Sequence, residues 1–182
     1  AHIHIGLQEI LAREISPMSE LVITCGAFNA GDAGNAIPQS ATMQGTIRVF
    51  DKKTEDLAKK RITEIASGIA QTYRCAATTT FGRPSPAVFN DKEFMEQCVE
   101  YTKQTLPQAQ LYGGAHGMGS EDFGSISQAC TANYMMIGAA AGPLNECYGQ
   151  HNPHVRFDEN ALPMSSALYA SVAMNWLDDN AK

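Results

Sequence analysis

A run of alternating side chains at residues 41–50 places the strongest constraint on the fold. Met43, Gly45, Ile47 and Val49 share one face of this run, and Thr42, Gln44, Thr46 and Arg48 share the other. A period of two residues predicts a β-strand with one buried and one solvated face. Apolar residues at helical spacing follow and predict a long amphipathic helix over residues 53–73.

The elements around this strand predict one supersecondary unit. A helix precedes Pro17, a strand covers residues 21–28, a loop covers 29–38, and a Thr-rich strand covers 75–81. The order helix, strand, strand, helix, strand matches a ferredoxin-like split βαβ unit that lacks its first strand. Because that strand is normally interior, its absence leaves backbone groups inside the sheet without partners.

Pro84-Ser85-Pro86 marks a boundary between a first domain over residues 1–85 and a second over 86–182. In the second domain, Asn90 and Glu93 have capping-box spacing and predict a helix over 91–106 that Pro107 ends. Strands alternating with helices predict an α/β layer. The further expected elements are strands over 108–112 and 133–138, a short helix over 123–129, a loop over 142–157, and a final helix over 160–177.

Charge and cysteine usage exclude several classes of function. The formal net charge is −6, which disfavours nucleic-acid binding, because that needs clustered Lys and Arg. No apolar run approaches the roughly 20 residues of a membrane-spanning helix. The five cysteines include no CxxC pair. We therefore expect buried thiols in a reducing, cytoplasmic compartment and no contact with membranes.

Two histidines in His151-Asn152-Pro153-His154 are candidates for metal binding. Neutral imidazole is a common ligand of Zn²⁺ and similar ions, and a loop before a helix is a suitable position for it. The alternative is that both are loop residues with hydrogen-bonded side chains. His116, within a glycine-rich loop, is interpreted as a loop residue and not as a catalytic group.

Two further groups of polar residues are candidates for substrate binding. Gly119-Ser120-Glu121-Asp122-Phe123 places paired carboxylates beside glycines, and Glu121 is our candidate near the active site; the alternative is a helix cap followed by a core phenylalanine. Asn35 and Arg48 lie 13 positions apart, and an amide and a guanidinium can together hold a carboxylate. The alternatives are a turn-stabilising Asn35 and a solvated Arg48.

In this order, Gly34-Asn35-Ala36-Ile37-Pro38, the Gly119 motif and the His151 motif resemble the second half of a metal-dependent amidohydrolase of the M20 peptidase family, in its aminoacylase, hippurate hydrolase and auxin-conjugate hydrolase branch. The resemblance implies an incomplete lid or dimerisation domain over 1–85 and the C-terminal part of a zinc-peptidase-like catalytic domain over 86–182. It implies that His151 binds one of two divalent ions (zinc, manganese, cobalt or nickel) and that Asn35, Arg48 and Glu121 bind substrate. One departure is that Val155 or His154 occupies the position of a family aromatic residue.

The resemblance further implies a homodimer that acts on a small N-acyl amino acid. The family's other metal ligands and its general base lie in an N-terminal segment that has no counterpart in this chain. We therefore expect the isolated chain to be inactive and to bind no metal tightly, because tight sites need three or four protein ligands. The alternative is a non-catalytic dimerisation or binding module derived from the same family.

Overall fold

The computed structural model describes residues 1–114 and 117–181, which fall into two compact units. The first unit comprises residues 1–87 and 117–122, and the second comprises 88–114 and 123–181. His116 and the adjoining Ala115 lie outside the described residues. No described helix is both long and apolar enough to cross a lipid bilayer.

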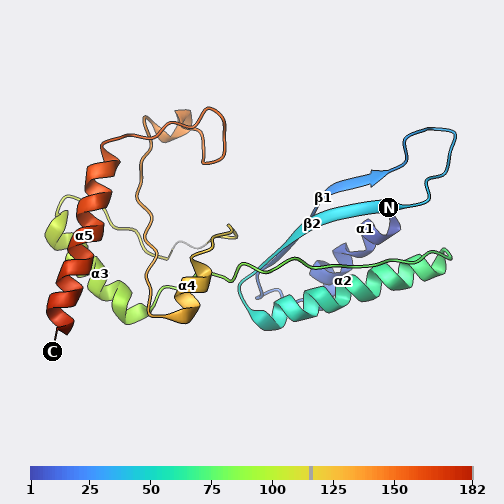
Figure 1. The fold of residues 1–182 in the computed structure, drawn as a ribbon, viewed down its shortest axis with the longest axis horizontal. Coiled ribbons are helices and arrows are strands. Elements are labelled where there is room, and N and C mark those ends of the chain that lie inside the picture. Colours follow the sequence, from blue (N-terminus) through green and yellow to red (C-terminus); the bar gives the residue numbers. More distant parts are fainter. Residues whose placement is uncertain (115–116, 182) are drawn as a thin grey trace. The chain divides into compact units, whose positions relative to one another are not determined.

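The first unit is built on a two-stranded antiparallel sheet of β1 (Leu21–Ala30) and β2 (Ala41–Val49) (Figure 1). The register runs from Leu21 opposite Val49 to Ala30 opposite Ala41, with a bulge between Cys25 and Ala27. Both expected strands are confirmed, and β1 continues two residues beyond its predicted end.

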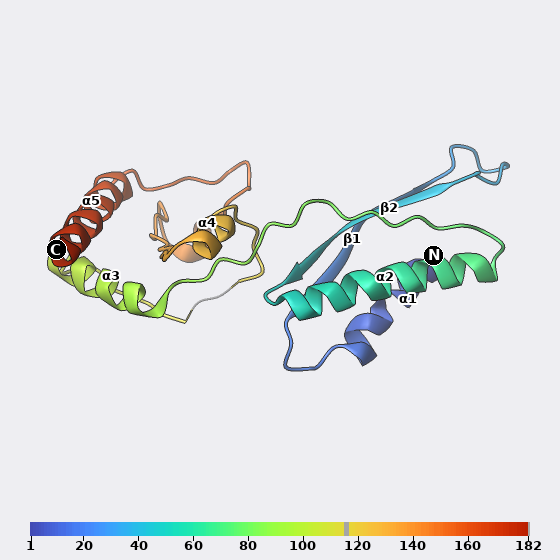
Figure 2. The same cartoon turned by 60° about the horizontal axis from the view of Figure 1, so that its bottom comes forward.

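Helices cover one face of this hairpin (Figure 2). They are α1 (His2–Gly6), the π-helical turn η1 (Ile10–Glu14) and the long α2 (Lys52–Thr72). Asp51 caps α2 by accepting a hydrogen bond from the Thr54 N–H at 2.8 Å. The single helix expected before Pro17 is interrupted, because the Ile15 N–H bonds to the Ile10 carbonyl with π-helical spacing.

The core of the first unit confirms the alternation of β2. Its buried members are Leu7, Ile10, Leu21 and Ala58. Met43, Ile47 and Val49 pack against them from the predicted apolar face of β2. Burial of this face is what fixes the register of the hairpin, because a slip of one residue would turn every one of these side chains to solvent.

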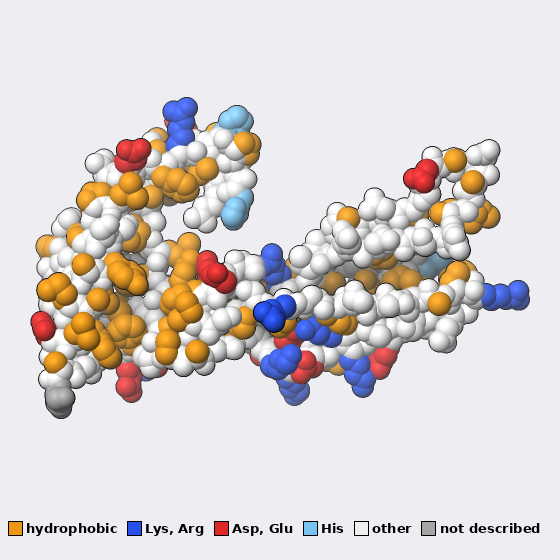
Figure 3. Space-filling view, viewed as in Figure 1, with side chains coloured by type: hydrophobic (Ala, Val, Ile, Leu, Met, Phe, Trp, Pro, Cys, Tyr) orange, Lys and Arg blue, Asp and Glu red, His pale blue; other side chains and the backbone are white. Residues whose placement is uncertain are grey.

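The second unit is organised by two helices, α3 (Lys92–Thr105) and α5 (Ala161–Asn180). Cys98 and Tyr101 of α3 form a buried cluster with Leu168 and Val172 of α5. Shorter elements are α4 (Gly124–Ala129) and the 3-10 turn η2 (Leu144–Glu146). Figure 3 shows hydrophobic side chains on the surface of this unit. The exposed large side chains of α5 include Leu162, Tyr169 and Met174.

Three predicted strands are wrong for the described residues. Residues 75–81, 108–112 and 133–138 join no sheet, and the second unit contains one isolated bridge, between Ala140 and Phe157, in place of an α/β layer. The cause is the absence of partners: an extended segment becomes a strand only when a neighbour takes up its N–H and C=O groups.

The predicted cap of α3 is also wrong by one residue. Asp91, not Asn90, accepts the hydrogen bond from the Phe94 N–H, at 2.9 Å. The Asn90 amide instead donates to the Tyr134 carbonyl at 3.0 Å and accepts from the Tyr134 N–H at 2.7 Å. Asn90 thus binds the extended segment 133–138 as a neighbouring strand would.

Candidate functional site

Asn35 lies in the exposed loop that connects β1 to β2. The turn is closed by a hydrogen bond from the Ala36 N–H to the Ala33 carbonyl at 3.3 Å, with Gly34 and Asn35 at its centre. A short amide side chain is favoured in such a turn. The side chain projects from the hairpin loop and is exposed.

Arg48 lies near the other end of the hairpin, opposite Val22 in β1, and its side chain is half-buried. Seven residue steps of β2 separate it from Ala41, where the loop ends, which is roughly 23 Å of extended chain. The structure therefore does not bring Asn35 and Arg48 together within one copy of the chain. Each remains a separate candidate for substrate binding.

Glu121 belongs to the first unit, although it follows much of the second unit in sequence. The Ser85 hydroxyl donates to its backbone carbonyl at 2.9 Å, and the Asp122 N–H donates to its carboxylate at 2.9 Å. The alternative that Ser120 or Asp122 caps a helix is wrong, because α4 starts at Gly124 without a side-chain cap. Phe123 is half-buried, with its ring 5.3 Å from that of Tyr134.

His151 is held by two successive turns in the second unit. The Asn152 N–H donates to the Gly149 carbonyl at 3.3 Å, and the Val155 N–H donates to the Asn152 carbonyl at 3.0 Å. His151 has a backbone φ of 68°, a left-handed conformation that is uncommon for a residue with a Cβ. Such a conformation in a non-glycine residue favours a functional role.

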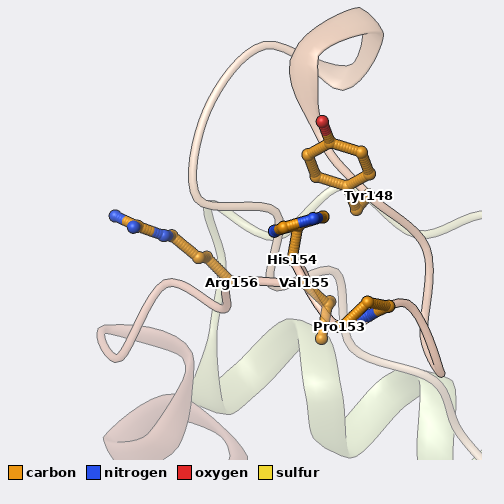
Figure 4. A pocket seen from close by; sticks show the side chains of 5 residues that line it. All are labelled: Tyr148, Pro153, His154, Val155 and Arg156. Atoms are coloured by element: carbon orange, nitrogen blue, oxygen red, sulfur yellow. The ribbon is translucent and has the colours of Figure 1, made fainter.

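The rings of His154 and Tyr148 lie next to each other, and both residues line a hollow in the same loop (Figure 4). The two ring centroids are 5.4 Å apart, with an angle of 47° between the planes. The His154 N–H donates to the Asn152 side chain at 2.9 Å. The Asn152-Pro153 dipeptide is a turn signal in the sequence, whereas no signal pointed to Tyr148 or Ser85.

The described residues do not form a complete metal centre. Among them, no three His, Cys, Asp or Glu side chains are grouped closely enough to hold an ion. Tight sites in proteins use three or four such ligands. His151 lies in the second compact unit and Glu121 in the first.

The comparisons with known proteins concern nearly the whole chain. The model of "Peptidase family M20/M25/M40" matches residues 2–175, a range that includes the motifs at Asn35, Glu121 and His151. The chain belongs to this family. The membership confirms the resemblance drawn from those motifs.

Individual M20 relatives match the chain over almost its full length. An IAA-amino acid hydrolase (ILR1-like 2) of Arabidopsis thaliana is 32% identical over 97% of the chain, and a hippurate hydrolase of Campylobacter jejuni is 29% identical over 95%. The Bacillus subtilis YXEP protein, described as a dinuclear metal-binding peptidase from the M20 family, superposes with a TM-score of 0.76 at 26% identity and 97% coverage of the chain.

The match covers only part of each relative. The chain spans 40% of the Arabidopsis hydrolase, 44% of the Campylobacter hydrolase and 44% of the YXEP protein. The fold of this M20 chain is thus that of a portion of these relatives.

Proposed function

We propose that this chain is the C-terminal portion of a metal-dependent amidohydrolase that cleaves the amide bond of an N-acyl amino acid. The observation that carries the proposal is the match of the M20 family model over residues 2–175. The matched relatives include hydrolases of amino-acid conjugates and an N-acetyldiaminopimelate deacetylase. These names have in common the hydrolysis of an amide between an acyl group and an amino acid.

In the proposed complete enzyme, His151 supplies one ligand to a centre of two divalent ions. The dinuclear metal-binding description of the YXEP protein supports this assignment. The ions would supply an activated water molecule and polarise the amide carbonyl. The left-handed backbone of His151, fixed by two turns, gives the imidazole a constant starting point for coordination.

Arg48 is proposed to bind the carboxylate of the amino-acid part. A guanidinium forms two parallel hydrogen bonds with a carboxylate, which fixes the orientation of the substrate. Arg48 makes no ion pair with any described residue, so its fork is not already committed to a carboxylate of the first unit. Asn35 and Glu121 are proposed to contact other parts of the substrate.

The first unit is proposed to have ferredoxin-like topology. In the split βαβ arrangement, the first strand lies between the last strand and the hairpin. That arrangement explains why residues 75–81 are extended and without a sheet partner, and why β2 has a second edge available for pairing. A segment equivalent to the first strand, contributed by the rest of the enzyme, would complete the sheet.

The chain alone is proposed to be inactive and to function as part of a cytoplasmic homodimer. The inactivity follows from the proposal that the remaining ligands and the general base belong to the rest of the enzyme. The competing function is a dimerisation or binding module without catalysis. The observation that favours it is the open edge of the hairpin, where Val22 and Phe28 are exposed and a second copy could pair.

Replacing Arg48 by glutamine in the complete enzyme distinguishes the two functions. A carboxylate-binding role predicts that KM rises about tenfold or more while kcat changes little, because uniform substrate binding is lost. A dimerisation module predicts an unchanged KM and a shift in the sedimentation coefficient. Arg83→Gln, at an exposed cation of the same unit, serves as the control. Unchanged kinetics in Arg48→Gln would overturn the assigned role.

A further inference from the structure

Asn152 lies at the junction of the two turns that hold His151. Its N–H donates to the Gly149 carbonyl at 3.3 Å and closes the first turn, and its carbonyl accepts from the Val155 N–H at 3.0 Å and closes the second. Its side-chain oxygen accepts a further hydrogen bond, from the His154 N–H at 2.9 Å. Asn152 is half-buried, whereas the residues directly on either side of it are exposed. One asparagine thus takes part in all three hydrogen bonds.

The first of these turns places His151 in a costly conformation. Of its two central residues, Gln150 and His151, only His151 has a positive φ, at 68°, which is the pattern of a type II turn. That position favours glycine, because the Cβ of a left-handed residue crowds the following carbonyl oxygen. Strained backbone of this kind persists only where the surrounding structure over-determines it. The hydrogen bond that closes the first turn therefore needs support from the adjoining chain.

The second turn supplies this support through the Asn152 side chain. A type I turn favours asparagine at its first position and proline at its second, which are the positions of Asn152 and Pro153. Pro153 fixes its own φ and has no N–H, so the next amide available to the side chain is that of His154. The bond to this amide restricts rotation of Asn152. Because the N–H of the same residue closes the first turn, a fixed Asn152 favours the left-handed conformation of His151.

We propose that Asn152 is the positioning residue of His151: its side chain holds the His151 backbone left-handed and thereby sets the direction from which the imidazole meets the metal. The metal part of this inference rests on the proposed amidohydrolase function, whereas the hold on the backbone does not. A reversal of φ at His151 redirects its Cα–Cβ bond and carries the imidazole with it. Groups that orient a metal ligand contribute to affinity, and their removal typically weakens metal binding roughly 10–100-fold.

NMR on the metal-free chain tests the hold on the backbone. A positive φ brings the amide and Hα protons of one residue close together, so wild type should give a strong intraresidue NOE at His151. Asn152→Ala should weaken this NOE. Asn152→Asp should keep it, because a carboxylate oxygen accepts the same hydrogen bond, and Asn152→Ser should be intermediate, because a hydroxyl closes such turns more weakly.

The control is Asn145→Ala, at an exposed asparagine of η2 in the same unit, which should leave the His151 NOE unchanged. A strong NOE in Asn152→Ala, or a loss as complete in Asn152→Asp, would overturn the proposal. If Asn152→Ala does not fold, the order of the other two variants decides: a stronger NOE with serine than with aspartate would contradict the role of the acceptor.

Metal affinity of the complete enzyme separates this proposal from the one on which it rests. A competing chelator should remove the metal from Asn152→Ala at roughly one tenth of the concentration that wild type needs, and Asn152→Asp should resemble wild type. Unchanged affinity in Asn152→Ala beside a loss of metal in His151→Ala would overturn the positioning role alone. Unchanged affinity in both would overturn the ligand role of His151 in the proposed function, while the NMR result on the backbone would stand.

Discussion

Asn35 and Arg48 lie at opposite ends of the β1–β2 hairpin, with the loop that contains Asn35 at one end and the Arg48–Val22 pair near the other. Sequence spacing suggested that both could hold a single carboxylate. Seven residue steps of strand β2 separate Arg48 from Ala41, where the loop ends, which makes a shared ligand within one copy impossible. Both residues could still bind substrate in two ways. They could make independent contacts with one substrate molecule, or they could act from different copies in a dimer.

This separation predicts that the effects of the two residues add. In the complete enzyme, Asn35→Ala and Arg48→Gln should each weaken substrate binding, and the double variant should show the sum of their free-energy changes within about 0.5 kcal/mol. The measurement is a double-mutant cycle on kcat/KM. A coupling energy above about 1 kcal/mol would show that the two side chains share one ligand group and contradict the separation.

Gly45 is required by the bulge in the partner strand. A Cβ built on Gly45 would lie 2.1 Å from the Thr24 carbonyl oxygen and 3.3 Å from the Cys25 Cα. Gly45→Ala should therefore lower the free energy of unfolding of the first unit by about 1–3 kcal/mol, as overpacking does elsewhere. Urea denaturation followed by far-UV circular dichroism measures this change.

Gly68 provides the matched control, because a Cβ there meets no atom within 4 Å and the residue lies inside α2. Gly68→Ala should stabilise the helix by up to about 1 kcal/mol through its higher helix propensity. Destabilisation in both variants would indicate that the loss in Gly45→Ala does not arise from the close approach of Thr24.

The Tyr101 hydroxyl donates to the Asp179 carboxylate at 2.6 Å and joins α3 to α5. This hydrogen bond, together with desolvation, raises the pKa of Tyr101 to about 12. The folded state holds the phenolic proton more tightly than the unfolded state, so the stabilisation is complete below pH 10 and is lost as the pH rises from about 10 to 12. Urea midpoints measured across this range should fall in wild type.

Tyr101→Phe should remove that pH-dependent fall, because it has no proton to release. Tyr169→Phe, at an exposed tyrosine of α5, is the control and should retain the fall seen in wild type. A Tyr101→Phe variant whose midpoint declines as steeply as that of wild type would contradict the assignment of this pH dependence to Tyr101.

The sequence predicted the elements whose signals are local. The alternation of β2, the apolar spacing of α2 and the Pro107 that ends α3 all depend on near neighbours, and the structure contains these elements. The three wrong strands depend on pairing between distant segments, which periodicity alone does not show. Asn90 is a further case of a distant partner. Its residue type and its spacing from Glu93 suggested a helix cap, whereas its actual partner, Tyr134, lies 44 positions away.

Asn90 and Asp91 should therefore differ in what they stabilise. Asp91→Ala removes a helix cap and should cost about 1 kcal/mol, with fraying of the first turn of α3. Asn90→Ala removes both hydrogen bonds to Tyr134 and should release the segment 133–138 while α3 remains intact. Hydrogen exchange at the Tyr134 amide separates the two variants: exchange should accelerate in Asn90→Ala and stay near the wild-type rate in Asp91→Ala. Equal acceleration in both would contradict this division of roles.

The backbone of His151 predicts a trade between stability and metal binding. A non-glycine residue in the left-handed region carries a conformational cost of roughly 1–2 kcal/mol, which glycine avoids. His151→Gly should therefore raise the stability of the second unit by up to about 1 kcal/mol, less the extra entropy that glycine gains on unfolding. His151→Ala keeps the strain and should leave stability near the wild-type value.

In the complete enzyme, both variants should lower the metal content measured by mass spectrometry, because both lack the imidazole. Only the glycine variant should also raise the unfolding midpoint of the second unit. This contrast isolates the ligand role from the backbone role, since the two substitutions remove the same side chain and differ in the strain that they leave. Full metal occupancy in both variants would show that His151 is not a ligand, and the left-handed backbone would then require another explanation.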